Sequence, residues 1–250
     1  MKTRRLVFIV FIPIVFICSC KKLNETVGGN LTTGQVTNNS SAELLRGVYA
    51  SLAPTFTSYL DIFALSDMTT DEAIVPTRGN DWDDNGMWRL LHQHKWDPGH
   101  KTIRDCFKSL GGVVFAATDI LQYNPNAQQK AEARFLRAWA MYWLLDLFDQ
   151  VPYREPGENI VQPAKVRKGI EALNYIISEI NAVQADLPDD PASTNKANKS
   201  AAKVLLMKCY LNKGVYADRA NPSFDLLDMN KVISLADEII NGNKIGRAHV

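Results

Sequence analysis

Nearly every face of a helix drawn over Lys130–Phe148 would carry a large apolar side chain. These side chains are Phe135, Leu136, Trp139, Tyr142, Trp143, Leu144, Leu147 and Phe148. A helix that is apolar around most of its circumference has to be covered by other elements on several sides. We therefore expect this segment to lie at the centre of a helical assembly. The exposed part of the helix is expected to be its polar start, namely Gln128, Lys130, Glu132 and Arg134.

Five further segments have the apolar spacing of helices, namely 41–52, 102–123, 174–187, 201–212 and 231–240. Strand-like alternation is confined to a short possibility at Val151–Tyr153. Small residues such as Ala138 and Ala201 stand where two helices could approach closely. Although a clean repeat of about 34 residues is absent, we predict an all-α fold of stacked helix–turn–helix pairs. These pairs would be like tetratricopeptide units and joined by long irregular loops.

Charge and composition exclude several classes of protein. The 250 residues contain 28 Lys and Arg against 27 Asp and Glu, so the chain lacks the excess positive charge that binds nucleic acid. Hydrophobic residues make up 46% of the chain, which excludes an intrinsically disordered protein. Four cysteines are too few for a disulfide-rich scaffold. We expect Cys106 and Cys209 to be buried free thiols.

Residues 1–19 have the pattern of a bacterial export signal, in which basic residues precede an apolar run. The run, Leu6–Ile17, is shorter than the roughly 20 residues that a membrane-spanning helix needs. After this run the segment ends in Ile17–Cys20, which resembles a lipobox, so we expect Cys20 to be the site of lipid attachment. A plain secretory signal or an inner-membrane anchor is the alternative. Residues 20–41 are rich in Asn, Thr and Gly and are interpreted as a flexible tether.

The end of the sequence has an artificial pattern. Residues 245–250 can be back-translated into the start of a common sequencing adapter. We therefore expect these residues to be an artefact and the natural chain to continue. Residues 42–244 would then be the incomplete N-terminal part of a helical domain, and His249 would have no functional role.

Acidic residues gather between two of the expected helices, namely Asp67, Asp71, Glu72, Asp81, Asp83 and Asp84. Paired carboxylates can act as acid and base in glycoside hydrolysis or bind Ca²⁺, but a solvated acidic loop is the simpler interpretation. His92, His94 and His100 lie nearby, yet they are not accompanied by the cysteine or HExxH pattern of a zinc site. We therefore predict no catalytic residue, no metal and no cofactor.

Residues 70–98 are expected to form a long loop without regular structure, which is uncommon unless the loop is functional. Indole rings beside polar groups suit a sugar site, because the ring packs on the C–H face of a pyranose while polar groups bind its hydroxyls. Trp88 and Trp96 are more simply explained as anchors that hold the loop to the core. Trp82 is flanked by polar residues and is expected to be exposed. The predicted ligand-binding residues are Arg78, Asn80, Asp81 and Trp82.

Several of these motifs resemble those of the SusD/RagB family. They include the lipobox, Leu44–Tyr49, Asp71–Trp82 and Ala236–Ile240, and the most specific is Glu132–Trp139 leading into Leu145–Pro152. The resemblance covers residues 20–243 and implies a helical, surface-exposed lipoprotein of the outer membrane. Such a protein captures a nutrient, usually a glycan, and delivers it to a SusC-like TonB-dependent transporter without catalysing a reaction.

The sequence is compatible with other functions as well. Some members of the family take peptides, so a RagB-like peptide-binding protein is one alternative. A lipid-anchored helical-repeat scaffold without a ligand is another. A lipid-anchored glycosidase that uses the loop carboxylates would release reducing ends and would lose that activity on Asp71→Asn. The sequence does not identify the sugar.

Overall fold

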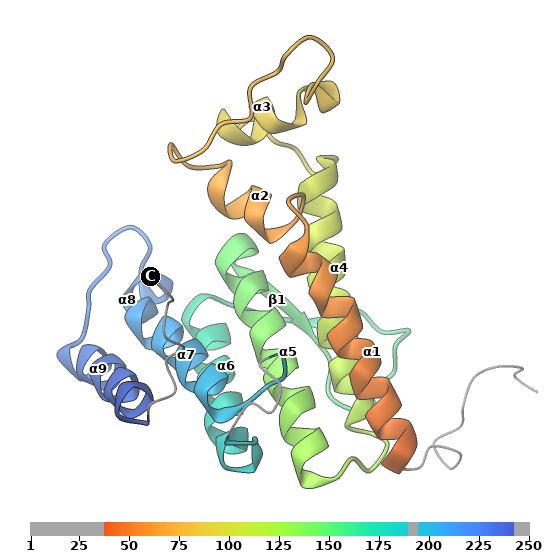
Figure 1. Ribbon diagram of the computed structural model, residues 1–250, viewed down its shortest axis with the longest axis vertical. Helices are drawn as coiled ribbons and strands as arrows, with labels where there is room; N and C mark the ends of the chain where they lie inside the picture. Colours follow the sequence, from red (N-terminus) through yellow and green to blue (C-terminus); the bar gives the residue numbers. More distant parts are fainter. Residues whose placement is uncertain (1–37, 190–194, 243–250) are drawn as a thin grey trace, which may run out of the picture. The chain divides into compact units, whose positions relative to one another are not determined.

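The computed structural model describes residues 38–189 and 195–242 (Figure 1). All of the helices expected from apolar spacing are present: α1 (Asn38–Thr57), α4 (Lys101–Ile120), α5 (Ala127–Phe148), α6 (Gly169–Val183), α7 (Lys199–Leu211) and α9 (Leu226–Asn241). The prediction of a mainly helical fold is confirmed.

Helix α5 is the centre of the helical packing, as its sequence predicts. It contacts α1, α4, α6 and α7, and its buried face includes Phe135, Leu136, Met141, Leu144 and Leu145. A capping box begins the helix, because the Asn126 side chain accepts the Gln129 N–H at 2.8 Å and the Gln129 side chain accepts the Asn126 N–H at 3.0 Å.

The prediction of an exposed polar start to α5 is wrong at two positions. Glu132 is buried, and its carboxylate accepts hydrogen bonds from Tyr49 Oη of α1 at 2.7 Å and from Gln128 Nε2 at 2.9 Å. Arg134 is half-buried and donates to the carboxylate of Glu179 in α6 at 2.6 and 3.1 Å. Polar groups can be buried here because partners on neighbouring helices replace their bonds to water.

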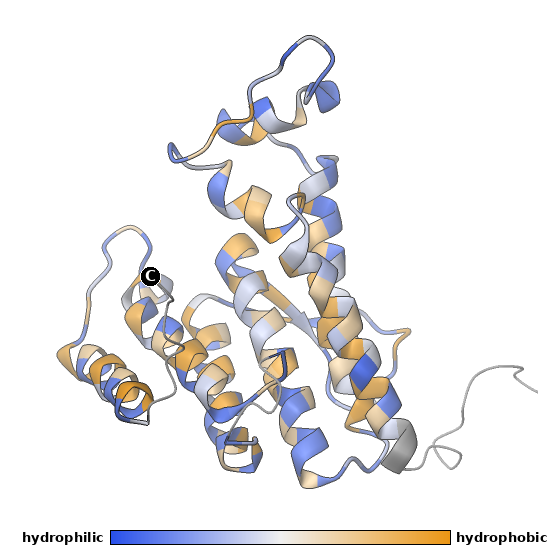
Figure 2. Cartoon of the chain, in the orientation of Figure 1, coloured by the Kyte–Doolittle hydropathy of each residue, from blue (hydrophilic) through white to orange (hydrophobic). Residues whose placement is uncertain are grey.

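Consecutive helices pack against one another as pairs. Residues 121–126 join α4 to α5, and the two helices contact each other, which makes an αα-hairpin. Further contacts join α5 to α6, α6 to α7 and α7 to α9, as the series of ribbons in Figure 1 shows. Hydrophobic and hydrophilic residues alternate along these ribbons in Figure 2, as amphipathic helices require. This is the stacking predicted for tetratricopeptide-like pairs.

A two-stranded hairpin separates α5 from α6. Strand β1 (Gln150–Tyr153) pairs antiparallel with β2 (Lys165–Lys168). The strand suspected at Val151–Tyr153 is confirmed, whereas its partner β2 was not predicted from the sequence.

Three short helices were also missed: α2 (Ile62–Asp67), α3 (Met87–His92) and α8 (Lys213–Ala217). The 3-10 turns η3 (Asp84–Gly86) and η4 (Gln184–Asp186) complete the set. Because η3 and α3 lie within residues 70–98, the prediction of a loop without regular structure is wrong there. Elements of three to six residues are too short for apolar periodicity to reveal them.

Both cysteines within the described residues are buried and free, as predicted. Burial raises the pKa of the Cys106 thiol and that of the Cys209 thiol to about 12. Because the thiolate is the reactive form, burial and the raised pKa both disfavour reaction of these cysteines in the folded protein.

We expect neither thiol to react with Ellman's reagent in the folded protein at mildly alkaline pH, and both to react in urea. The measurement is a time course of colour formation on a chain that begins after Cys20, so that only Cys106 and Cys209 are counted. Rapid labelling of either cysteine before unfolding would contradict its burial between the helices.

Several predictions concern residues outside the described ones, namely the export signal at 1–19, lipid attachment at Cys20 and the adapter-derived residues 245–250. Helix α1 begins at Asn38, inside the range assigned to the tether. Ser41 is fully buried, and its Oγ donates to the Tyr123 carbonyl at 2.9 Å. The tether boundary at residue 41 is therefore drawn too late. None of the described helices has the length and apolarity needed to cross a bilayer.

Candidate ligand-binding site

A tight turn over Gly79 and Asn80 positions the predicted site residues. The N–H of Arg78 donates to the Asp81 carbonyl at 3.1 Å, and the N–H of Asp81 donates to the Arg78 carbonyl at 3.0 Å. Gly79 has φ of +62°, a left-handed conformation that glycine adopts at little cost. The turn leaves the side chains of Arg78, Asn80 and Asp81 exposed, so a ligand can reach them.

The backbone just beyond this turn is strained. Trp82, Asp84 and Asn85 have φ values of 58°, 39° and 55°, a region that costs a non-glycine residue about 1–3 kcal/mol. Such conformations persist where the surrounding structure holds them. Here Trp88 Nε1 of α3 donates to Asp84 Oδ2 at 2.7 Å. The short helix therefore fastens the strained segment that carries Trp82.

Tyr59, Trp82 and Trp88 form an aromatic cluster beside this segment. The ring centroids are 5.7 Å apart for Tyr59 and Trp82, 6.1 Å for Tyr59 and Trp88, and 6.0 Å for the two indoles. Trp88 is only 4% exposed, whereas Tyr59 is 54% and Trp82 49% exposed. One buried indole thus supports two rings that are open to solvent.

The three tryptophans of this segment differ in their roles. Trp82 is exposed and Trp88 is a buried anchor, as predicted. The expectation that Trp96 is also an anchor is wrong, since its side chain is 45% exposed and its ring lies 5.4 Å from that of His94. Trp96 is therefore not part of the core.

A hollow of about 390 Å³ adjoins the turn. It is lined by Ile74, Val75, Pro76, Arg78, Asp81 and Trp82. Three of the four predicted site residues therefore share one concave surface. Asn80 is not among the lining residues and lies at the exposed tip of the turn.

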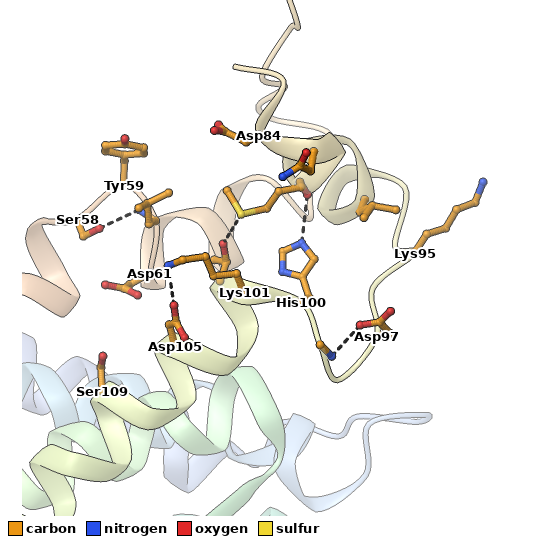
Figure 3. A pocket seen from close by; sticks show the side chains of 16 residues that line it. Ser58, Tyr59, Asp61, Asp84, Lys95, Asp97, His100, Lys101, Asp105 and Ser109 are labelled. Atoms are coloured by element: carbon orange, nitrogen blue, oxygen red, sulfur yellow. Dashed lines mark hydrogen bonds and ion pairs between the residues drawn. The ribbon is translucent and has the colours of Figure 1, made fainter. Parts of the chain in front are cut away.

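A second and larger cavity, of about 740 Å³, lies on the Tyr59 side of the aromatic cluster (Figure 3). The lining includes residues from the α1–α2 connection, such as Tyr59 and Asp61, and residues from the start of α4, such as Lys101 and Asp105. Because Tyr59 lines this cavity and contacts Trp82, which lines the smaller hollow, the two concave surfaces meet at the aromatic cluster.

Charged groups line the wall of this larger cavity. Lys101 Nζ lies 2.7 Å from Asp105 Oδ2, and this hydrogen bond holds the pKa of Asp105 below its usual range. Partial burial, together with the negative charge of Asp105, raises the pKa of Asp61. The charge of Asp105 is therefore balanced by Lys101, whereas the ionised form of Asp61 is disfavoured.

The acidic and histidine residues considered as metal ligands do not form a metal centre in the described part of the chain. No group of three His, Cys, Asp or Glu side chains there could hold a metal ion. The Nε2 atom of His94 lies 2.7 Å from the Thr69 carbonyl, and that of His100 lies 3.2 Å from the Met87 carbonyl. These imidazoles therefore make local hydrogen bonds within the segment that precedes α4.

Sequence reasoning missed Tyr59, Asp61 and the cavity that they line. The signal that could have found them is the run Ser58–Asp61, in which an aromatic residue and a carboxylate follow directly on the apolar spacing of a helix. That run lies 21 or more residues before Trp82, so only the folded chain brings them together.

No family model matches the chain. The chain is, however, 30% identical over 176 residues to starch-binding protein SusD from Bacteroides thetaiotaomicron. The match covers 65% of this chain and 30% of SusD. The chain thus spans less than a third of the length of this curated relative.

Solved structures share the fold at lower sequence identity. A SusD superfamily protein from Bacteroides thetaiotaomicron matches with a TM-score of 0.66 and 16% identity, covering 86% of this chain and 48% of its own. Surface glycan-binding protein A from the same organism, in complex with laminarihexaose, matches with a TM-score of 0.60 and 17% identity over 81% of this chain and 42% of its own. Taken with the helical architecture, these likenesses show that the chain shares the fold of these solved structures and is similar in sequence to SusD.

Proposed function

We propose that this chain binds oligosaccharides through the surface formed by Arg78, Asp81, Trp82 and Tyr59, with Asn80 at its rim. The observation that carries the proposal is the pair of exposed aromatic rings, Tyr59 and Trp82, supported by the buried indole of Trp88. Rigid, exposed rings of this kind offer a stacking surface for the apolar face of a sugar. A stacking surface that is already ordered binds with less loss of conformational entropy.

The polar groups beside the rings supply the complementary contacts. The Arg78 guanidinium can donate and the Asp81 carboxylate can accept hydrogen bonds, and both side chains line the hollow next to Trp82. Sugar hydroxyls do both, so this pair suits a hydroxyl-rich ligand. Such a site would bind its ligand reversibly, without a covalent step.

The names of the similar proteins support the same class of ligand. SusD is a starch-binding protein, and one of the structural neighbours is in complex with laminarihexaose. Another is a laminarin-binding SusD-like protein, with a TM-score of 0.61 and 16% identity. A glycan-binding role is thus named for several of the similar proteins, although this chain spans only part of each.

The proposal extends to the place where the protein acts. Cys20, lipid-modified after removal of residues 1–19, would anchor the chain in the outer membrane with its folded part at the cell surface. There it would pass bound oligosaccharide to a SusC-like TonB-dependent transporter. The lipobox pattern and the sequence similarity to SusD support this part of the proposal.

The test is a binding panel measured by isothermal titration calorimetry. We expect the protein to bind at least one of maltohexaose, laminarihexaose and a xyloglucan oligosaccharide, and to leave a mixture of short peptides unbound. Binding of the peptides with no binding of any glycan would favour the peptide-binding alternative. A protein that binds neither class but co-purifies with a transporter barrel would favour the scaffold.

A further inference from the structure

Asp61 occupies the position before helix α2 at which an aspartate usually caps a helix, but its side chain does not do so. Its carboxylate makes no capping hydrogen bond to α2, and no other described residue donates a hydrogen bond to it. The side chain instead lines the larger cavity, beside Tyr59. Figure 3 shows Asp61 beside the side chains of Lys101 and Asp105.

The carboxylates that line the cavity differ in whether they accept a hydrogen bond from the protein. Its lining contains four carboxylates, those of Asp61, Asp84, Asp97 and Asp105. Asp84 accepts a hydrogen bond from Trp88 Nε1 at 2.7 Å, Asp97 from the Gly99 N–H at 2.7 Å, and Asp105 from Lys101 Nζ at 2.7 Å. Asp61 is the remaining carboxylate, and its acceptor oxygens are open to a ligand.

The two lysines of the lining do not supply a cation for a bound anion. Lys101 is engaged with Asp105 in an ion pair. Lys95 extends away from the other labelled side chains in Figure 3. The third basic side chain, His100, is buried, and its Nε2 lies 3.2 Å from the Met87 carbonyl. A negatively charged group beside Asp61 would therefore meet carboxylates, while Lys101 is already paired with Asp105 and Lys95 extends away from this part of the lining.

We propose that this cavity is a selectivity subsite of the glycan-binding surface, in which Asp61 accepts hydrogen bonds from sugar hydroxyls and excludes anionic sugars. The inference rests on the proposed function and adds the class of glycan, namely uncharged oligosaccharides rather than uronic-acid or sulfated ones. Tyr59 connects the subsite with the Trp82 surface because it lines the cavity and contacts Trp82. One glycan chain can therefore contact both.

The physical basis of the selection is the difference between a hydroxyl and a carboxylate beside Asp61. A hydroxyl donates to an ionised carboxylate, which is one of the stronger hydrogen bonds in proteins. A uronate carboxylate has no proton to donate at neutral pH and meets like charge in a partly desolvated place, where screening by water is reduced. We therefore expect at least tenfold weaker binding of an anionic glycan.

The experiment compares neutral and anionic probes on the wild-type protein and two variants. The neutral probes are maltohexaose, laminarihexaose and a xyloglucan oligosaccharide, and the anionic probe is an oligogalacturonate of similar length. Asp61→Asn removes the charge without changing the shape. Asp83→Asn is the matched control, because Asp83 is exposed and lies outside both concave surfaces. The wild-type protein is also measured at low and at physiological salt.

We expect the ratio of the two dissociation constants, anionic over neutral, to fall about tenfold in Asp61→Asn and to stay unchanged in Asp83→Asn. Higher salt should narrow the same ratio in the wild-type protein, since salt screens repulsion between charges. The salt measurement needs no variant and so does not depend on the folding of Asp61→Asn. Equal affinity of the wild-type protein for both classes, or an unchanged ratio in Asp61→Asn, overturns this inference but leaves glycan binding intact. Binding of none of the four probes overturns the proposed function as well.

Discussion

Replacing Glu179 with alanine is expected to lower the free energy of unfolding by about 3–5 kcal/mol, the usual cost of removing one partner from a buried ion pair. Glu179 of α6 is 7% exposed, and its carboxylate binds two arginines of α5. Arg134 Nη2 lies 2.6 Å from Oε1, and Arg137 Nη2 donates to Oε2. The Arg137 side chain is itself only 4% exposed, so the variant would leave a buried cation without its counter-ion.

The measurement is urea-induced unfolding followed by circular dichroism. Glu43→Ala is the matched control, because Glu43 also pairs with an arginine, Arg46 at 2.7 Å, but both side chains are exposed. The control should lose less than about 1 kcal/mol. If Glu179→Ala and Glu43→Ala had similar midpoints and slopes, the ion-pair network would not be what fastens α6 to α5.

The same network predicts how stability depends on pH. Burial by itself would raise the pKa of Glu179, but the hydrogen bonds and charges of Arg134 and Arg137 outweigh it and hold the pKa below its usual range. A carboxyl whose pKa is lower in the folded state stabilises the fold above its unfolded pKa, and this contribution is lost as pH falls through the folded value. The wild-type protein should therefore lose stability in acid more steeply than Glu179→Gln does.

Replacing Trp82 with alanine is expected to weaken oligosaccharide binding by about 1–3 kcal/mol, or roughly 5- to 150-fold in the dissociation constant. The indole is 49% exposed and contacts the rings of Tyr59 and Trp88, so its loss removes one of the two open stacking faces. Alanine keeps the Cβ atom, so the left-handed backbone at this position is equally strained in both proteins. The measurement is calorimetric titration with the tightest-binding oligosaccharide of the panel.

Trp96→Ala is the matched control for this variant. Trp96 is 45% exposed, close to the value for Trp82, but it lines neither of the two concave surfaces. Its replacement should leave the dissociation constant within about twofold of the wild-type value, since surface changes away from a site have small effects. Equal weakening by both substitutions would show that exposed indoles act non-specifically, and unchanged binding by Trp82→Ala would remove Trp82 from the site.

Apolar periodicity was sufficient to locate the long helices, because burial of one face repeats every three to four residues and leaves a local record in the sequence. Helix α5 is the clearest case, since its apolar residues predicted a central position and the fold confirms it. The buried thiol of Cys209 was found in the same way, because it lies in an apolar stripe. The short helices α2 and α3 leave no such record because neither completes two full turns.

Polar residues within the helices show where this approach fails. Glu132 has the sequence surroundings of an exposed residue, yet it is buried because Tyr49, 83 residues earlier, donates a hydrogen bond to it. Arg134 is half-buried because it donates hydrogen bonds to Glu179, which lies 45 residues further along the chain. Whether a polar side chain is buried depends on a partner that is distant in sequence, so its local context cannot reveal it.

The sequence by itself determined the helical class of this protein, the helix at its centre and the exposure of Trp82 between polar neighbours. Only the tertiary structure decided that Tyr59 and Asp61, from the connection between α1 and α2, join Trp82 and the start of α4 around two adjoining concave surfaces. The physical reason is that secondary structure follows from interactions between near neighbours in the chain. A binding surface instead depends on which distant segments the packed helices bring into contact.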